Sequence, residues 1–245
     1  MKIIKTFQNR CFQLVVIGLT FALTLDSCGM SDLKKNDVNQ KEETVIPTPD
    51  SLQKQITIFN LGYYSFRGIG VVACWQHYIP GTAAEKTGIN AKTQAKLLTY
   101  LKVRDVYILK TNALFPHLKL TAGDTLFAFF SSHPDRCLQS FYQDNSLIES
   151  KITAVKAKGV EVYFMIGSMI GLLSEMTDWA DISKEKPVVQ GISEIVTTYS
   201  SLIPESIRKP MTELSKFEGQ KISPATVAQI QSLTEQIFQQ INSGK

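Results

Sequence analysis

The chain has 245 residues, of which 44% are hydrophobic and 20% charged, and its formal net charge is +4. This length and hydrophobic fraction are enough for one domain with a sizeable core. No basic run is interleaved with aromatic residues, which argues against a nucleic-acid partner. No internal repeat indicates a solenoid.

The N-terminal segment has the pattern of a bacterial export signal that ends at a cysteine. Basic residues precede an apolar stretch at 11–25, and small Ser27 stands directly before Cys28. The apolar stretch is too short for a comfortable transmembrane helix. Residues 25–28, Leu-Asp-Ser-Cys, resemble the lipobox of bacterial lipoproteins, although Asp26 occupies a position where that family usually has a small or apolar residue.

The resemblance implies a signal peptide at 1–27 and a lipidated Cys28 that holds the protein on a membrane. In this family, Asp after the cysteine tends to retain the protein in the inner membrane, and the position here is Gly29. We therefore expect a lipid-anchored protein of the bacterial cell envelope, at the outer membrane if the cell has two membranes. The alternatives are an ordinary cleaved secretory signal, an uncleaved anchor or a buried helix.

The segment after the cysteine has the composition of a flexible tether. Residues 28–55 contain almost no large apolar side chain, so they cannot bury enough surface to offset their ordering entropy. Pro47 and Pro49 stiffen the end of this segment. We expect a single folded domain at 56–245.

The fold prediction depends on short apolar runs that are rich in β-branched or aromatic residues. Such runs are typical of strands buried on both faces, and they lie at 56–61, 70–75, 106–109, 126–130 and 160–166. Asn90 is expected to cap a helix before the third run, and Gly159 to end a helix before the fifth. This alternation predicts an α/β fold with a largely parallel sheet and flanking helices. The C-terminal part is expected to be helical, at 187–202, 205–217 and 224–241, where Ser223 would cap the last helix.

Three segments of the expected sheet resemble the first half of (β/α)8-barrel glycoside hydrolases. They lie at 67–72, 103–107 and 154–163, and the resemblance covers about residues 56–170. It implies an incomplete or abbreviated barrel, because a full barrel needs about 250 residues.

Glycoside hydrolases also need two carboxylates across the scissile bond, and no such pair is recognisable. Glu175, Asp178 and Asp181 follow the last expected strand, and we interpret them as the solvated face of a helix beside Trp179. The segment Phe-Glu-Gly around Glu218 is faintly similar to an acid-bearing strand of these enzymes. The catalytic residues therefore stay unknown.

Cysteine and histidine residues follow two expected strands. Cys74 and His77 could join His133 and Cys137 as two sulfur and two nitrogen ligands, the set of a structural zinc. In an oxidising compartment, an even pair of cysteines more often forms a disulfide, and two buried free thiols are the third reading. No metal is favoured and no cofactor is expected.

The ends of parallel strands are where α/β sheets bind ligands. The candidate ligand-binding residues at these ends are Trp75, Gln76, His77, Ser132 and His133. We expect the domain to bind or process glycans, with polysaccharide and the membrane as partners. The first alternative is a non-catalytic envelope scaffold or assembly lipoprotein, and the second is a metal-supported hydrolase using His77 and His133.

Overall fold

Helices build the part of the chain that the computed structural model describes, which is residues 49–74, 83–121, 137–155, 158–179, 189 and 191–244. Residues Ser51–Lys245 cluster into one unit. The helices are α2 (Pro49–Ala73), α3 (Ala83–Leu114), α5 (Cys137–Thr153), α6 (Lys158–Asp178), α7 (Ile192–Thr198), the 3-10 helix η2 (Ser200–Leu202), α8 (Glu205–Ser215) and α9 (Pro224–Ser243). Across these ranges, β structure is limited to a parallel bridge between Val189 and Glu218 and an isolated bridge position at Lys221.

The predicted α/β fold is therefore wrong. The expected strand at 56–61 lies inside α2, as do residues 70–73 of the one at 70–75. The one at 106–109 lies inside α3 and the one at 160–166 inside α6, while the run at 126–130 falls outside the described residues. The parallel sheet, the abbreviated barrel and the likeness to glycoside hydrolases depended on these strands and are overturned with them. The physical reason is that a helix buried on every side shows the same unbroken apolar run as a strand buried on both faces.

The expected helix boundaries also shift. Asn90 lies inside α3 instead of capping a helix, α5 ends at Thr153, and Gly159 belongs to the first turn of α6. The helix α2 begins at Pro49, within the segment that we assigned to the tether. The helices expected at 205–217 and 224–241 are present as α8 and α9.

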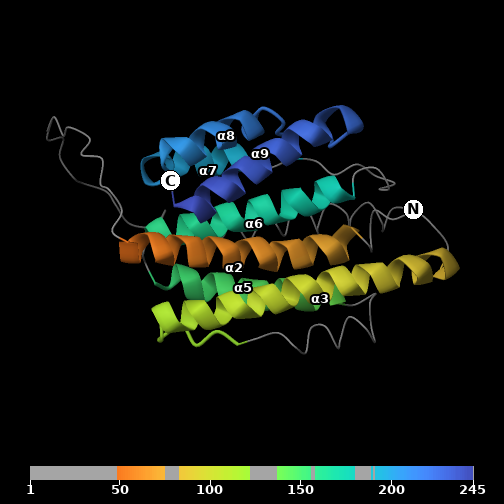
Figure 1. Ribbon diagram of the computed structural model, residues 1–245, viewed down its shortest axis with the longest axis horizontal. Helices are drawn as coiled ribbons and strands as arrows, with labels where there is room; N and C mark the ends of the chain where they lie inside the picture. The colour runs from red at the N-terminus through yellow and green to blue at the C-terminus, as the bar shows by residue number, and fades with distance from the viewer. Residues whose placement is uncertain are drawn as a thin grey trace, which may run out of the picture. The chain divides into compact units, whose positions relative to one another are not determined.

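The helices α2 and α6 touch backbone to backbone. A Cβ atom added to Gly167 would lie 2.1 Å from the Phe59 carbonyl oxygen, and one added to Gly171 would lie 2.2 Å from that of Tyr63. Such distances are far inside van der Waals contact, so only glycine allows this approach. α6 also packs against α9, which places it between α2 and α9 (Figure 1).

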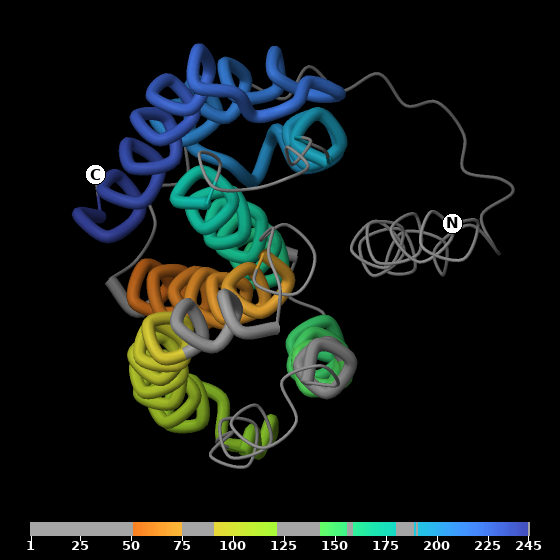
Figure 2. The backbone as a smooth tube through the Cα atoms, turned by 90° about the vertical axis from the view of Figure 1, so that its right-hand side faces the viewer, coloured from red at the N-terminus to blue at the C-terminus, as the bar shows by residue number. Residues whose placement is uncertain are grey.

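Figure 2 shows α3 and α5 on the side of α2 away from α6. Large apolar side chains of α2, α3 and α5, together with Phe164 of α6, form one buried cluster. The buried cluster includes Ile58 and Leu61 from α2, Ile108 from α3, and Ile148 and Ile152 from α5. Burial of each such side chain stabilises the fold by about 1.5 to 3 kcal/mol. α2 is therefore held both by close backbone contact with α6 and by a cluster of bulky side chains shared with α3, α5 and α6.

One described segment, Gly159–Asp178, is long and apolar enough to cross a membrane by length and composition. Its apolar window is 78% buried inside the domain. Since the core helix of a helical domain meets the same criterion, this finding by itself does not place α6 in a membrane.

Candidate functional site

Four charged side chains from three helices meet at one end of the α2–α6 contact. Arg67 comes from α2, Lys96 from α3, and Glu175 and Asp178 from α6. Glu175 and Asp178 are three positions apart, which places them on one face of the helix. We call these four residues the charge cluster.

Glu175 is the centre of the charge cluster. Its side chain is 0% exposed. Oε2 accepts hydrogen bonds from Nε and Nη2 of Arg67 at 3.2 and 3.0 Å, while Oε1 accepts one from Trp179 Nε1 at 2.6 Å and lies 2.6 Å from Lys96 Nζ. Both oxygens are thus engaged, as a buried carboxylate requires.

Asp178 closes the charge cluster on its solvent side. Its Oδ2 accepts hydrogen bonds from Arg67 at 2.6 Å and from Lys96 at 3.1 Å, and its side chain is 38% exposed. Two cations therefore face two carboxylates. Arg67 also donates from Nη1 to the Tyr63 hydroxyl at 3.0 Å and lies over the Tyr100 ring.

The charge cluster shifts the pKa of its neighbours. Burial raises the pKa of the Tyr100 hydroxyl, and the negative charge of Glu175 raises it further. Burial also raises the pKa of the Cys74 thiol well above its ordinary value, again assisted by Glu175. Burial alone would lower the pKa of Arg67, but Tyr63 and Glu175 outweigh it, so this guanidinium stays charged.

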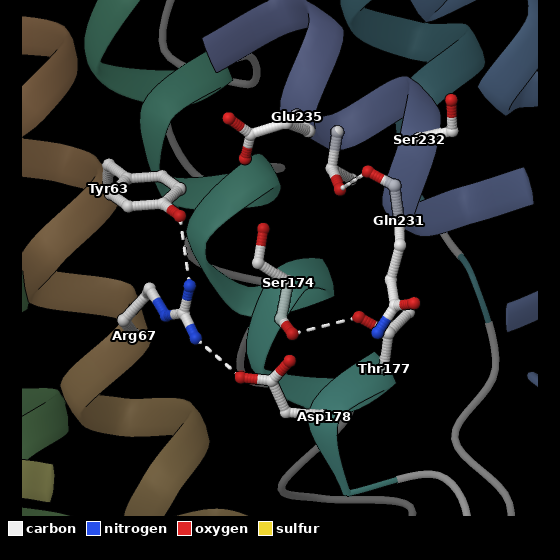
Figure 3. A pocket seen from close by; sticks show the side chains of 9 residues that line it. Tyr63, Arg67, Ser174, Thr177, Asp178, Gln231, Ser232 and Glu235 are labelled. Carbon is white, nitrogen blue, oxygen red and sulfur yellow. Dashed lines mark hydrogen bonds and ion pairs between the residues drawn. The ribbon is translucent and has the colours of Figure 1, made fainter. Parts of the chain in front are cut away.

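A groove of about 400 Å³ opens beside the charge cluster, between α2, α6 and α9 (Figure 3). Every lining residue is polar or charged; they are Tyr63, Arg67, Ser174, Thr177, Asp178, Gln231, Ser232, Thr234 and Glu235. Close packing of α2 against α6 and of α9 against α6 fixes the three walls. The groove therefore offers hydroxyl, amide, carboxylate and guanidinium groups on helical elements of the core.

The structure does not test the sequence-predicted ligand-binding residues. Trp75, Gln76, His77, Ser132 and His133 lie outside the described residues, as does Cys28.

Cys74 is a free, buried thiol in the structure. The side chain of Cys137, at the start of α5, is not among the described ones, so the disulfide stays a prediction. Within the described ranges, no group of three or more metal-binding side chains occurs.

Glu175 and Glu218, two of the acids that the sequence suggested, have structural roles. Glu175 is fully buried, so interpreting it as part of a solvated face was wrong. The carboxylate of Glu218 accepts a hydrogen bond from the Ile192 N–H at 2.9 Å and contacts Ser193, and so caps the start of α7. Asp181 lies outside the described residues.

Sequence reasoning missed Arg67 and Lys96. A usable signal existed for Arg67, because it is the single Lys, Arg, Asp or Glu between Lys54 and Glu85. Glu175 stands equally alone between Glu161 and Asp178. Two isolated and opposite charges in two apolar stretches predict that they pair when both stretches are buried.

No protein-family model, no curated protein and no solved structure matches this chain.

Proposed function

We propose that the chain is a lipid-anchored lipoprotein of the bacterial cell envelope whose helical domain binds a glycan, without hydrolysing it, in the groove between α2, α6 and α9. The observation that carries the proposal is the convergence of hydroxyl, amide, carboxylate and guanidinium groups from three helices on one open space of about 400 Å³. Each hydroxyl of a sugar both donates and accepts a hydrogen bond, so such a mixed lining suits it. The groove also falls in the size range of small-molecule sites.

The engagement of the groove acids favours binding over hydrolysis. Glycosidic hydrolysis commonly needs one carboxyl as acid and a second as base or nucleophile across the bond. Asp178 is held by Arg67 and Lys96, and Glu235 accepts a hydrogen bond from Gln239 at 2.5 Å. Asp178 is thus paired with two cations, which leaves Glu235 as the one carboxylate of the lining without an ion-pair partner among the described residues, where hydrolysis commonly needs two.

The lipid anchor rests on the sequence around Cys28. A Cys28→Ala variant should lose lipid labelling and leave the membrane fraction. If this variant still carries label and sediments with membranes, the lipoprotein assignment is wrong.

The binding role is tested by titrating the full-length chain, in a mild non-ionic detergent, with a panel of envelope and plant polysaccharides. We expect saturable binding of at least one glycan and no release of reducing ends. Gln231→Ala should weaken that binding about fivefold to tenfold, because it removes a hydrogen-bonding amide from the groove. Gln229→Ala, the same change at an exposed position of α9 that does not line the groove, is the matched control.

A second candidate is a non-catalytic scaffold for an envelope assembly. It is favoured by the exposed apolar side chains of α3, where Val106 is 48% and Leu109 is 67% exposed one helical turn apart. Replacing both by serine should shift the chain to a smaller complex in native electrophoresis of detergent extracts. Unchanged migration, together with glycan binding, would leave the groove as the functional surface.

A further inference from the structure

Three hydroxyl groups in the groove have already used their protons. Ser174 donates to the Ile170 carbonyl at 2.8 Å, Thr177 to the Ser174 carbonyl at 2.9 Å, and Thr234 to the Gln231 carbonyl at 2.9 Å. A hydroxyl that donates to its own helix can offer only its lone pairs to a ligand. These three positions are therefore acceptors.

Arg67, the cation that lines the groove, also uses most of its N–H groups within the protein. The guanidinium of Arg67 makes four hydrogen bonds, to Glu175, Asp178 and Tyr63. Five N–H groups are available on an arginine, so at most one remains for a ligand.

Carboxylate oxygens remain at both ends of the groove. Figure 3 shows Asp178 and Glu235 at opposite ends, with Ser174 between them. In the described structure, Oδ1 of Asp178 and Oε2 of Glu235 have no hydrogen-bond partner. Asp178 is already neutralised within the charge cluster, whereas the charge of Glu235 on α9 is not balanced by any cation that lines the groove.

We infer that the ligand of this groove carries a free ammonium group, and that among glycans the groove selects amino sugars that are not acylated. This inference rests on the proposed glycan binding. The ammonium group donates to Glu235, and the ring hydroxyls donate to Ser174, Thr177 and Asp178. The remaining donors of the lining, which are the Gln231 amide and the hydroxyls of Tyr63 and Ser232, can pair with the oxygens of any sugar. Acylation removes the positive charge that would pair with Glu235, so an acylated amino sugar loses the contact that distinguishes the free amine.

The test compares three β-1,4-linked tetrasaccharides that differ at one substituent: the oligomers of glucosamine, N-acetylglucosamine and glucose. The full-length chain in detergent is titrated at about pH 6, where an amine of this kind is protonated. We expect the glucosamine oligomer to bind at least about tenfold more tightly than the other two. Its affinity should fall with added salt, since the contact is ionic and partly exposed.

Glu235→Gln should lower the affinity for the glucosamine oligomer about tenfold and leave that for the glucose oligomer unchanged. Glu213→Gln, an exposed acid on α8, is the matched control and should change neither. Equal affinities for the three oligomers would overturn the ammonium preference and leave glycan binding standing. Binding of none of them would overturn both proposals, and binding of spermidine without any sugar would support the ammonium preference while overturning the glycan.

Discussion

Two regions of the domain bury an arginine, Arg67 beside the α2–α6 contact and Arg104 between α3 and α5. The guanidinium of Arg67 makes four hydrogen bonds to three side chains, and its side chain is still 15% exposed. Arg104 is 0% exposed, yet it has two carboxylate partners, Asp144 at 2.7 Å and Asp105 at 3.4 Å, and its Nε has no partner. The deeper arginine is therefore the less completely paired.

The difference lies in where the carboxylates are. Glu175 is wholly buried and depends on Arg67 and Lys96 for its charge compensation, whereas Asp144 is 22% and Asp105 is 19% exposed and both retain access to water. Removing a partner from a fully buried charge costs far more than removing one from a charge that water can reach. The charge cluster should thus behave as one cooperative unit, and the Arg104 pair should not.

The largest expected effect comes from Glu175→Gln. The amide preserves volume but leaves Arg67 and Lys96 facing Asp178 alone, which should lower the free energy of unfolding by about 3 to 5 kcal/mol. Chemical denaturation of the full chain measures it. Adding Lys96→Met to this variant restores the balance of charge and should recover part of the loss; if the two changes are additive, the charge cluster is not a unit.

Gly167→Ala tests the backbone contact that brings Arg67 to Glu175. The new methyl group would meet the Phe59 carbonyl oxygen at 2.1 Å, so the two helices must separate, at a cost of about 3 kcal/mol in unfolding free energy. Gly159→Ala in the same helix is the control, because nothing lies within 4 Å of its Cβ position. The control should be neutral or slightly stabilising, since alanine favours helix over glycine. Equal losses in the two variants would show that α2 and α6 are not in close contact.

The parts of the fold differ in how far the sequence alone predicts them. The start of α9 is predicted by local chemistry, because a serine followed by proline favours a helix start wherever it occurs. The structure confirms Ser223 as the N-cap and Pro224 as the first helical residue. The type of the buried segments was mispredicted because burial on all sides erases the periodicity that separates a helix from a strand. Gly167 and Gly171, four positions apart, were a sign of helix contact, but only once a helix is assumed.

The candidate site divides in the same way. Arg67 and Glu175 could be paired from their isolation in apolar stretches, whereas Lys96 lies in a helix with many charges and gives no such signal. Convergence of α9 with α6 and α2 depends on tertiary packing, so no local pattern at Gln231 or Glu235 predicts the groove.

Glu149 on α5 is a partly buried acid without a cationic partner in the described structure, and it extends the comparison to the dependence of stability on pH. Burial, together with the nearby carboxylate of Glu161, raises the pKa of Glu149 from 4.5 to about 7. Between these two values the folded protein keeps a proton that the unfolded chain has lost. The contribution of Glu149 to stability is therefore largest below about pH 4.5 and is lost as the pH rises through about 7. The loss is roughly 3 kcal/mol, and Glu149→Gln should remove this pH dependence. Urea unfolding at several pH values measures the difference; parallel curves for the two proteins would contradict the shift.

Arg104→Met should have the smallest effect of the four. Methionine fills much of the space of the arginine stem, removes the buried Nε that lacks a partner, and leaves two carboxylates that water can solvate. We expect a change in unfolding free energy below about 1 kcal/mol, in either direction, because the variant removes a buried charge and the carboxylates left behind keep access to water. Arg67→Met is the matched comparison and should lower the free energy of unfolding by about 3 kcal/mol or more, since it removes the arginine that is paired with the buried Glu175 carboxylate. A loss at Arg104 as large as the loss at Arg67 would mean that Asp144 and Asp105 depend on their arginine as Glu175 does, and the contrast between the two regions would fail.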